Sequence, residues 1–468
     1  MLFNSIYFLF FLPSVVFLYY SIPHKFRWIL LFVASSFFYM FFYPPYILIL
    51  YAIILIDYLC GLWIENSKRK WRFVALLTSI LANIALLSYF KYYNFFIDML
   101  DEFALVIHKQ NPFHHLSILL PIGLSFHTFQ SLSYTIEVYR KKQKAEKHIG
   151  YFANYVLFFP QMVAGPIERF DRLGTQLHLK QKLTYDNIAN GFRLVLYGLF
   201  VKMCIADNFA PLVDEVYTNP QAYISTSVWI SMLAFSIQIY ADFYGYSTIA
   251  IGAARMLGID LMDNFRQPYF ATGIQNFWQR WHISLSTWFR DYVFFSMGGS
   301  KVNNARWLFN ILVLFAVSGF WHGANYTFII WGCLHGLAYL LDRFLQSELK
   351  INFTKNIFAK IVSASITFFT VTIIWVFFRS ESFEKAIIVL KQSLHYSINS
   401  TKSLALDVLT FIPFFVFLIV EILIYNKRFD KWIGEKKFIL RWFSYLVLLM
   451  SILLFSSIDT YPFIYFQF

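Results

Sequence analysis

Long apolar stretches, separated by short polar connections, dominate the pattern of hydrophobic and polar positions along this chain. Each approaches the roughly 20 residues that a helix needs to cross a bilayer. They occupy residues 2–21, 46–64, 73–90, 307–320, 361–378, 408–425 and 439–458. Because they are continuous and do not alternate apolar with polar positions, a β-barrel is disfavoured. We therefore predict an all-α, polytopic integral membrane protein with about 11–13 transmembrane helices in one domain over residues 1–468.

Two further segments are apolar but too interrupted to cross as single helices. Residues 151–170 contain Phe159-Pro160 and Gly165-Pro166, and residues 264–300 mix tryptophans with arginines. Irregular backbone is tolerated at membrane depth only where protein or a water-filled cavity covers it. These segments are either re-entrant, folding into a central cavity, or amphipathic helices lying flat at the cytoplasmic interface. The pattern alone leaves both interpretations open.

Composition and charge agree with a membrane protein. Hydrophobic residues make up 59% of the chain and charged residues only 14%, which excludes a soluble domain built around one core. The formal charge of +13 is divided among short loops, so an extended nucleic-acid-binding face is not indicated. The basic runs 68–72, 140–147 and 427–437 predict cytoplasmic loops under the positive-inside rule. With the apolar runs, they place both termini outside.

Two histidines stand out as candidates for chemistry. His282 and His322 lie in otherwise apolar surroundings, where ionisable groups are costly and usually mark a pathway or a reaction centre. Imidazole is also the side chain best suited to moving a proton near neutral pH. The usual signatures of hydrolases, ATPases, zinc proteases and dinucleotide-binding enzymes are absent. A metal site formed by these two histidines and His335 has no supporting ligand spacing, and we expect none.

Several ordered sequence blocks give the chain a family resemblance. These blocks are Ser88–Phe96, Pro121–Phe126, Gln161–Ile167, Asp242–Ser247, Ile251–Gly258, Phe277–Trp288, Trp321–Gly323 and Trp375–Arg379. Through them the chain resembles the membrane-bound O-acyltransferase (MBOAT) family, and within it the bacterial branch that acetylates alginate and peptidoglycan.

The resemblance implies that His322 is the active-site histidine and that His282 is a second functional position. Esterifying a sugar hydroxyl requires a base for its proton and stabilisation of the developing oxyanion. Burial favours the neutral imidazole, which makes His322 the candidate base and leaves His282 to polarise the carbonyl or bind the donor. Further substrate or donor contacts are predicted in and beside these blocks. They are Arg280, Trp281, Trp321, Asp242 and Ser286.

The same resemblance implies a donor and partners. We expect a cytoplasmic thioester donor, acetyl-CoA, no bound cofactor, and a cell-envelope polysaccharide as acceptor. A separate periplasmic or extracellular protein would complete the transfer, and the chain would lie in the bacterial cytoplasmic membrane. D-alanyl transfer from a carrier protein to teichoic acid, and a polysaccharide transporter or flippase without covalent chemistry, are the alternatives. The enzymatic hypothesis requires a continuous cavity that reaches His322.

Overall fold

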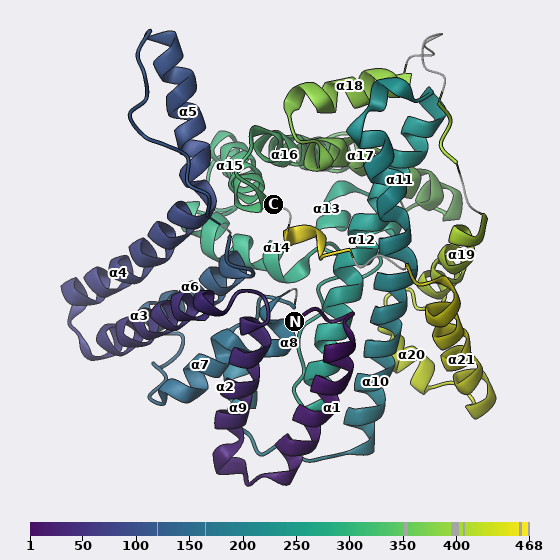
Figure 1. The fold of residues 1–468 in the computed structure, drawn as a ribbon. Coiled ribbons are helices and arrows are strands. Elements are labelled where there is room, and N and C mark those ends of the chain that lie inside the picture. Colours follow the sequence, from purple (N-terminus) through teal and green to yellow (C-terminus); the bar gives the residue numbers. More distant parts are fainter. Residues whose placement is uncertain are drawn as a thin grey trace. The chain divides into compact units, whose positions relative to one another are not determined.

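The computed structural model describes residues 1–118, 120–163, 165–350, 354–394, 402–405, 408–457 and 461–466. The regular elements in these ranges are all helices, and the described residues form no β-strand (Figure 1). Ala164 and Ile458, which belong to predicted segments, lie outside the described residues. The contacts divide the chain into two compact units. One contains Met1–Ala189 with Ala253–Met262, and the other contains Asn190–Gly252 with Asp263–Phe468. The predicted single domain stays a prediction.

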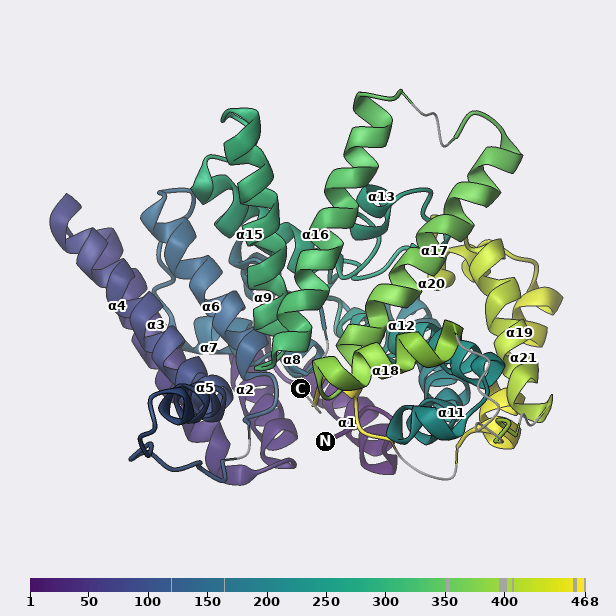
Figure 2. The same cartoon turned by 90° about the horizontal axis from the view of Figure 1, so that it is seen from above.

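The first unit is a set of packed helices from the amino-terminal part of the chain. They are α1 (Ile6–Ser21), α2 (His24–Met40), α3 (Ile47–Asn66), α4 (Arg69–Leu87), α5 (Tyr93–Val106), α6 (Leu124–Tyr139), α7 (Ile149–Leu157), α8 (Phe159–Met162) and α9 (Phe170–His178). Helices α3, α4 and α6 lie side by side in Figures 1 and 2.

A buried polar cluster joins α3, α4 and α6. The Asp57 carboxylate accepts hydrogen bonds from Ser79 Oγ at 2.5 Å, from Asn83 Nδ2 at 2.9 Å and from Ser131 Oγ. A carboxylate is costly to bury unless its oxygens are hydrogen-bonded, and here α3 supplies the carboxylate while α4 and α6 supply the donors. The cluster therefore fixes how the three helices pack.

The second unit contains the remaining helices. They are α10 (Tyr185–Phe200, whose residues up to Ala189 belong to the first unit), α11 (Asp207–Thr218), α12 (Ser225–Met256, whose last turn belongs to the first unit), α13 (Ile274–Trp278), α14 (Ile283–Phe289), α15 (Asn304–His322), α16 (Tyr326–Ser347), α17 (Ile357–Arg379), α18 (Phe383–Leu394), α19 (Val408–Leu423), α20 (Phe429–Gly434) and α21 (Phe438–Phe455). A π-helical stretch, η3 (Val201–Ala206), joins α10 to α11, and a 3₁₀ turn, η8 (Ile464–Phe466), follows α21.

Helices α15 and α16 approach each other backbone to backbone. A Cβ atom added at Gly332 would lie 2.2 Å from the carbonyl oxygen of Phe315, and one added at Gly319 would lie 2.2 Å from that of Phe328. Only glycine permits this approach, which resembles the small-residue packing of membrane helices. The glycines on either side of His335, Gly332 and Gly336, thus serve close helix packing.

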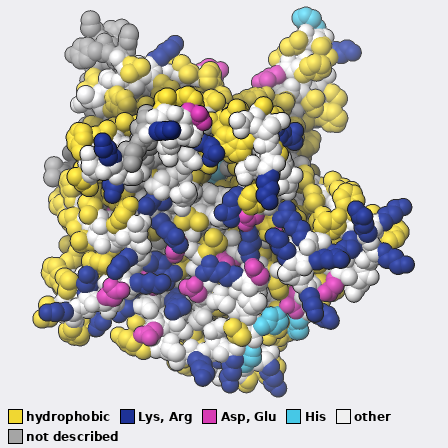
Figure 3. All heavy atoms as spheres, turned by 180° about the vertical axis from the view of Figure 1, so that it is seen from behind, with side chains coloured by type: hydrophobic (Ala, Val, Ile, Leu, Met, Phe, Trp, Pro, Cys, Tyr) yellow, Lys and Arg dark blue, Asp and Glu magenta, His cyan; other side chains and the backbone are white. Residues whose placement is uncertain are grey.

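Seven helical segments of the described chain are long and apolar enough to cross a membrane, and two shorter apolar helices accompany them. The apolar runs at 46–64, 307–320 and 361–378 correspond to α3, α15 and α17. The helical membrane fold is thereby confirmed, while the full number of crossings stays a prediction. On the face drawn in Figure 3, Lys and Arg side chains gather in groups beside areas covered by hydrophobic side chains.

The two interrupted segments consist of short helices and irregular backbone. Residues 151–170 contain α7 and α8, and residues 264–300 contain α13 and α14. Their centres are buried: Phe158 in the first, and Phe277 and Ser284 in the second, expose no surface. Helices lying flat at an interface would expose one face, so this burial favours the re-entrant interpretation.

Candidate active site

His322 ends helix α15 inside an aromatic cluster of the second unit. The helix stops here because Gly323 adopts an extended conformation, and Asn325 then caps α16 through its side chain. The imidazole ring is 4% exposed. Its ring centroid lies 5.1 Å from that of Trp331, 5.5 Å from Phe378 and 5.6 Å from Tyr465. These neighbours shield the imidazole from water.

His282 occupies the turn between α13 and α14 in a left-handed backbone conformation, with φ of 43°. Non-glycine residues rarely adopt this conformation, and such strain is often found at functional sites. Asn264 stabilises the turn through two hydrogen bonds. Its carbonyl oxygen accepts the Ile283 N–H at 2.9 Å, and its Oδ1 accepts the Ser284 hydroxyl at 2.6 Å. The fully buried imidazole is held edge-on to Phe243, with 4.6 Å between ring centroids.

Tyr465 connects the surroundings of the two histidines. Its ring lies 4.8 Å from that of Phe243, which contacts His282, and 5.6 Å from that of His322. Its hydroxyl has no hydrogen-bond partner among the residues that the structure describes. The structure therefore brings His282 and His322 into one aromatic cluster and adds a phenol that the sequence analysis did not identify.

Asp242 holds this phenol in place. One oxygen of its carboxylate accepts the Ile464 N–H at 2.7 Å, next to Tyr465 in the chain. The other oxygen pairs with Lys202 Nζ at 2.6 Å, and Lys202 also pairs with Asp207 at 2.6 Å. All three ionic side chains are almost completely buried. Asp242 thus supports the site through Ile464 and Lys202, and its role as a donor contact stays a prediction.

Trp331 lies between two histidines. Its ring centroid is 5.1 Å from that of His322 and 5.0 Å from that of His335. Within the described chain, its indole N–H and both ring nitrogens of His335 lack hydrogen-bond partners. An indole N–H without an acceptor, beside a candidate base, is suited to stabilise an oxyanion.

Two of the other predicted contact residues, Trp281 and Trp321, pack within the aromatic cluster. Trp281 is buried between Phe277 and Trp375, at ring distances of 5.4 and 5.0 Å. Trp321 lies beside His322, with ring centroids 4.9 Å apart. Both therefore help to enclose the cluster. Their roles as donor contacts stay predictions.

Arg280 and Ser286 lie toward the edges of the cluster. The Arg280 guanidinium donates to Asn426 Oδ1 at 2.9 Å and to the Tyr425 hydroxyl at 3.1 Å, and it lies over the Tyr425 ring. These bonds hold the turn after α19. Ser286 Oγ donates to the Trp281 carbonyl at 3.2 Å and also lines a groove.

The groove has a volume of about 500 Å³ and lies beside both histidine-bearing segments. Its lining includes Ile283, the residue after His282, and Ser318, one helical turn before His322. Exposed Arg290 and Arg343 also line it, among largely apolar side chains. An apolar groove with basic residues is suited to a thioester arm that ends in phosphates. Neither histidine lines the groove itself, so the continuous cavity to His322 stays a prediction.

Sequence reasoning did not identify Lys202, Trp331 or Tyr465. Lys202 carries a lone charge in an apolar run, which is a usable signal because isolated intramembrane charges need partners. Tyr465 gives no such signal, because tyrosine is abundant in this chain, with 31 residues. Only the fold reveals that it approaches His322.

Comparison with known proteins confirms the family resemblance. The model of the membrane-bound O-acyltransferase family matches residues 66–384. A probable alginate O-acetylase of Pseudomonas aeruginosa is 38% identical over 395 residues, which cover 82% of this chain and 73% of the relative. The peptidoglycan O-acetyltransferase of Helicobacter pylori is 35% identical over 431 residues, covering 84% and 79%. A teichoic acid D-alanyltransferase of Streptococcus thermophilus is more distant, at 27% identity over 56% of this chain and 69% of the relative.

Proposed function

Because this chain belongs to the membrane-bound O-acyltransferase family, we propose that it transfers an acetyl group from a cytoplasmic thioester, acetyl-CoA, for O-acetylation of a cell-envelope polysaccharide. The observation that carries the proposal is the burial of His322 among Trp331, Phe378 and Tyr465. The two O-acetyltransferase relatives support acetyl over D-alanyl transfer, since they match more of the chain at higher identity than the D-alanyltransferase.

The residues suggest how the transfer proceeds. His322 removes the proton of an attacking hydroxyl as its oxygen bonds to the acetyl carbonyl carbon. The oxyanion that forms is stabilised by donors such as the Trp331 N–H. Its collapse breaks the carbon–sulfur bond, and the proton held by His322 leaves with the thiol. The buried aromatic surroundings protect the thioester from water.

The sidedness of the reaction belongs to the same proposal. The protein would lie in the cytoplasmic membrane with both termini outside, so that the basic loops face the donor. The groove beside Ile283 and Ser318 would receive the thioester arm. A separate protein outside the membrane would pass the acetyl group to the polysaccharide.

The test is a His322→Gln variant, because glutamine preserves polarity and approximate size but cannot act as a base. Purified wild-type protein given labelled acetyl-CoA and an acceptor that carries a free hydroxyl should release CoA and form an acetyl ester, while the variant should lose about 100-fold or more in rate. Exposed His114→Gln provides the matched control. Acetylation that survives in a folded His322→Gln variant would contradict the proposal. Turnover only with a D-alanyl carrier protein would favour the D-alanyl alternative.

A further inference from the structure

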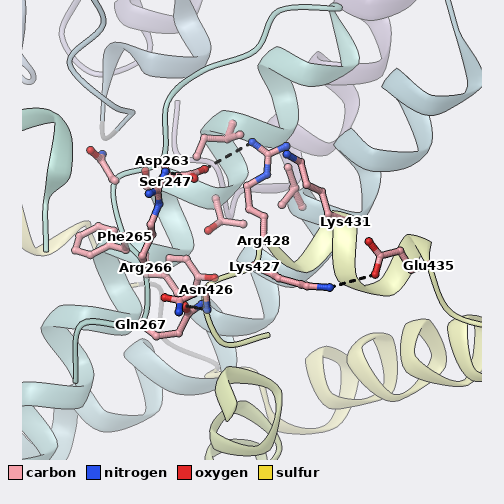
Figure 4. A pocket seen from close by; sticks show the side chains of 15 residues that line it. Ser247, Asp263, Phe265, Arg266, Gln267, Asn426, Lys427, Arg428, Lys431 and Glu435 are labelled. Carbon is pink, nitrogen blue, oxygen red and sulfur yellow. Dashed lines mark hydrogen bonds and ion pairs between the residues drawn. The ribbon is translucent and has the colours of Figure 1, made fainter. Parts of the chain in front are cut away.

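A second pocket of the same unit takes no part in the chemistry proposed above. It has a volume of about 400 Å³ and lies where the stretch 263–267 meets the residues around α20 (Figure 4). Its lining carries four basic and two acidic side chains. These are Arg266, Lys427, Arg428, Lys431, Asp263 and Glu435. The excess of positive charge favours an anionic occupant.

One of these basic side chains is not engaged by an acidic neighbour. Arg428 pairs with Asp430 at 2.8 Å and with Asp263 at 3.7 Å, and Lys427 pairs with Glu435 at 3.4 Å. Exposed Lys431 has no ion pair within the described chain. Its ammonium group is therefore available to an anion that enters the pocket.

Two buried hydrogen-bond donors form part of the pocket wall. Ser247 Oγ and Asn264 Nδ2 belong to residues that are each 1% exposed, and neither atom has a hydrogen-bond partner among the described residues. A buried donor without an acceptor is unfavourable. Two such donors and a lysine ammonium together match the oxygens of a phosphoryl group.

The helices that flank the pocket indicate where the phosphoryl group comes from. Lys427 follows α19, and α20 leads to α21, and both α19 and α21 expose large apolar side chains. Ile419 of α19 is 57% exposed, and Phe438 and Trp442 of α21 are 66% and 56% exposed. Such faces contact lipid tails, and basic residues at the ends of membrane helices lie near the lipid headgroups. The pocket is thus at the depth of phospholipid phosphates.

We propose that this pocket binds the phosphoryl group of an anionic phospholipid headgroup through Lys431, Ser247 and Asn264. Binding would also reach the candidate active site, because Asn264 accepts hydrogen bonds from Ile283 and Ser284, which directly follow His282. An occupied pocket stabilises this support of the strained turn. The effect on acetyl transfer rests on the proposed function, whereas lipid binding does not.

Lipid retention can be measured directly by native mass spectrometry. The full chain is released from nanodiscs of phosphatidylcholine mixed with phosphatidylglycerol. Wild-type protein should retain phosphatidylglycerol in preference to phosphatidylcholine. Lys431→Glu should reduce that retention by up to roughly fivefold, the upper end of what loss of one exposed charge pair costs. Lys437→Glu, which changes a nearby exposed lysine outside the pocket lining, should retain the lipid.

A second variant and two competitors complete the experiment. Ser247→Ala should weaken retention without changing any charge, which keeps the test valid if Lys431→Glu fails to fold. His322→Ala should lose acetylation but keep the lipid. Failure of the enzymatic proposal can therefore be distinguished from failure of the lipid-binding proposal. Equal retention by Lys431→Glu, Ser247→Ala and Lys437→Glu would overturn the inference. So would displacement of the lipid by equimolar inorganic phosphate or CoA, because the pocket would then bind a soluble phosphate.

Discussion

The buried ions Lys202, Asp207 and Asp242 predict an unequal response to two substitutions. Lys202 Nζ lies 2.6 Å from a carboxylate oxygen of each aspartate. Lys202→Met leaves two carboxylates close together with no positive charge between them. Asp242→Leu leaves Lys202 paired with Asp207 and also relieves repulsion between the carboxylates. We therefore expect Lys202→Met to be the more destabilising change.

The magnitudes follow from what each substitution leaves unpaired. Removing one partner of a buried ion pair costs about 3–5 kcal/mol, and Lys202→Met should fall in that range. Asp242→Leu keeps one ion pair but leaves the buried Ile464 N–H without its acceptor, a cost of about 1–3 kcal/mol. The free energies of unfolding should then differ by roughly 2 kcal/mol between the variants.

The free energies of unfolding of both variants can be measured by denaturant-induced unfolding in the same lipid nanodiscs, with a spectroscopic probe to monitor the transition. Lys391→Met, at an exposed lysine of α18, is the control and should unfold like the wild type. Asp242→Leu should also lower acetyl transfer under conditions where it remains folded, because Tyr465 loses the anchor at Ile464. Greater destabilisation by Asp242→Leu than by Lys202→Met would refute the reasoning.

Three further changes test other parts of the structure. Tyr465→Phe removes only the hydroxyl at the site. The rate of acetyl transfer should fall at least tenfold while the unfolding midpoint stays unchanged. Equal rates in the variant and the wild type would show that the hydroxyl is dispensable. Gly332→Ala should lower the unfolding midpoint because its Cβ would lie 2.2 Å from a backbone oxygen of Phe315. Gly336→Ala, whose nearest contact is a side-chain carbon at 3.2 Å, should be milder, and the opposite order would contradict the close packing. Burial raises the pKa of Glu168 from 4.5 to about 7, so the folded state binds the proton more tightly than the unfolded state. Stability should therefore fall as pH rises from about 4.5 through about 7, and Glu168→Gln should flatten this pH dependence, as measured by unfolding midpoints across that range.

The membrane fold could be predicted because hydropathy is a local property of the chain. The run at 361–378 is rich in apolar residues and carries no charge, and a helix forms over it as Ile357–Arg379. The interruptions in 264–300 were equally visible, since tryptophan and arginine alternate there with apolar residues. Burial of this segment decides between the re-entrant and the interfacial interpretation. That burial depends on the surrounding helices, so the periodicity of apolar residues in the segment could not predict it.

The geometry of the site depends on contacts between distant parts of the sequence. His282 and His322 were identified by chemical type in apolar surroundings, but nothing in their spacing shows that Phe243 and Tyr465 connect them. The partners of Asp242 could not be predicted for the same reason, because both Lys202 and Ile464 come from other elements. The left-handed backbone at His282 also has no sequence signal, since histidine usually adopts other conformations.

The glycine contact between α15 and α16 restricts how any acyl chain can enter the region around His322. Two helices whose backbones touch at Gly319 and Gly332 cannot separate or rotate by small steps without losing that contact. His322 and Trp331, one on each helix, therefore form a rigid wall. Tyr465 and the turn at His282 lie outside this glycine contact, so the contact does not fix their positions. The candidate base therefore belongs to the part of the site that the close helix packing holds in place.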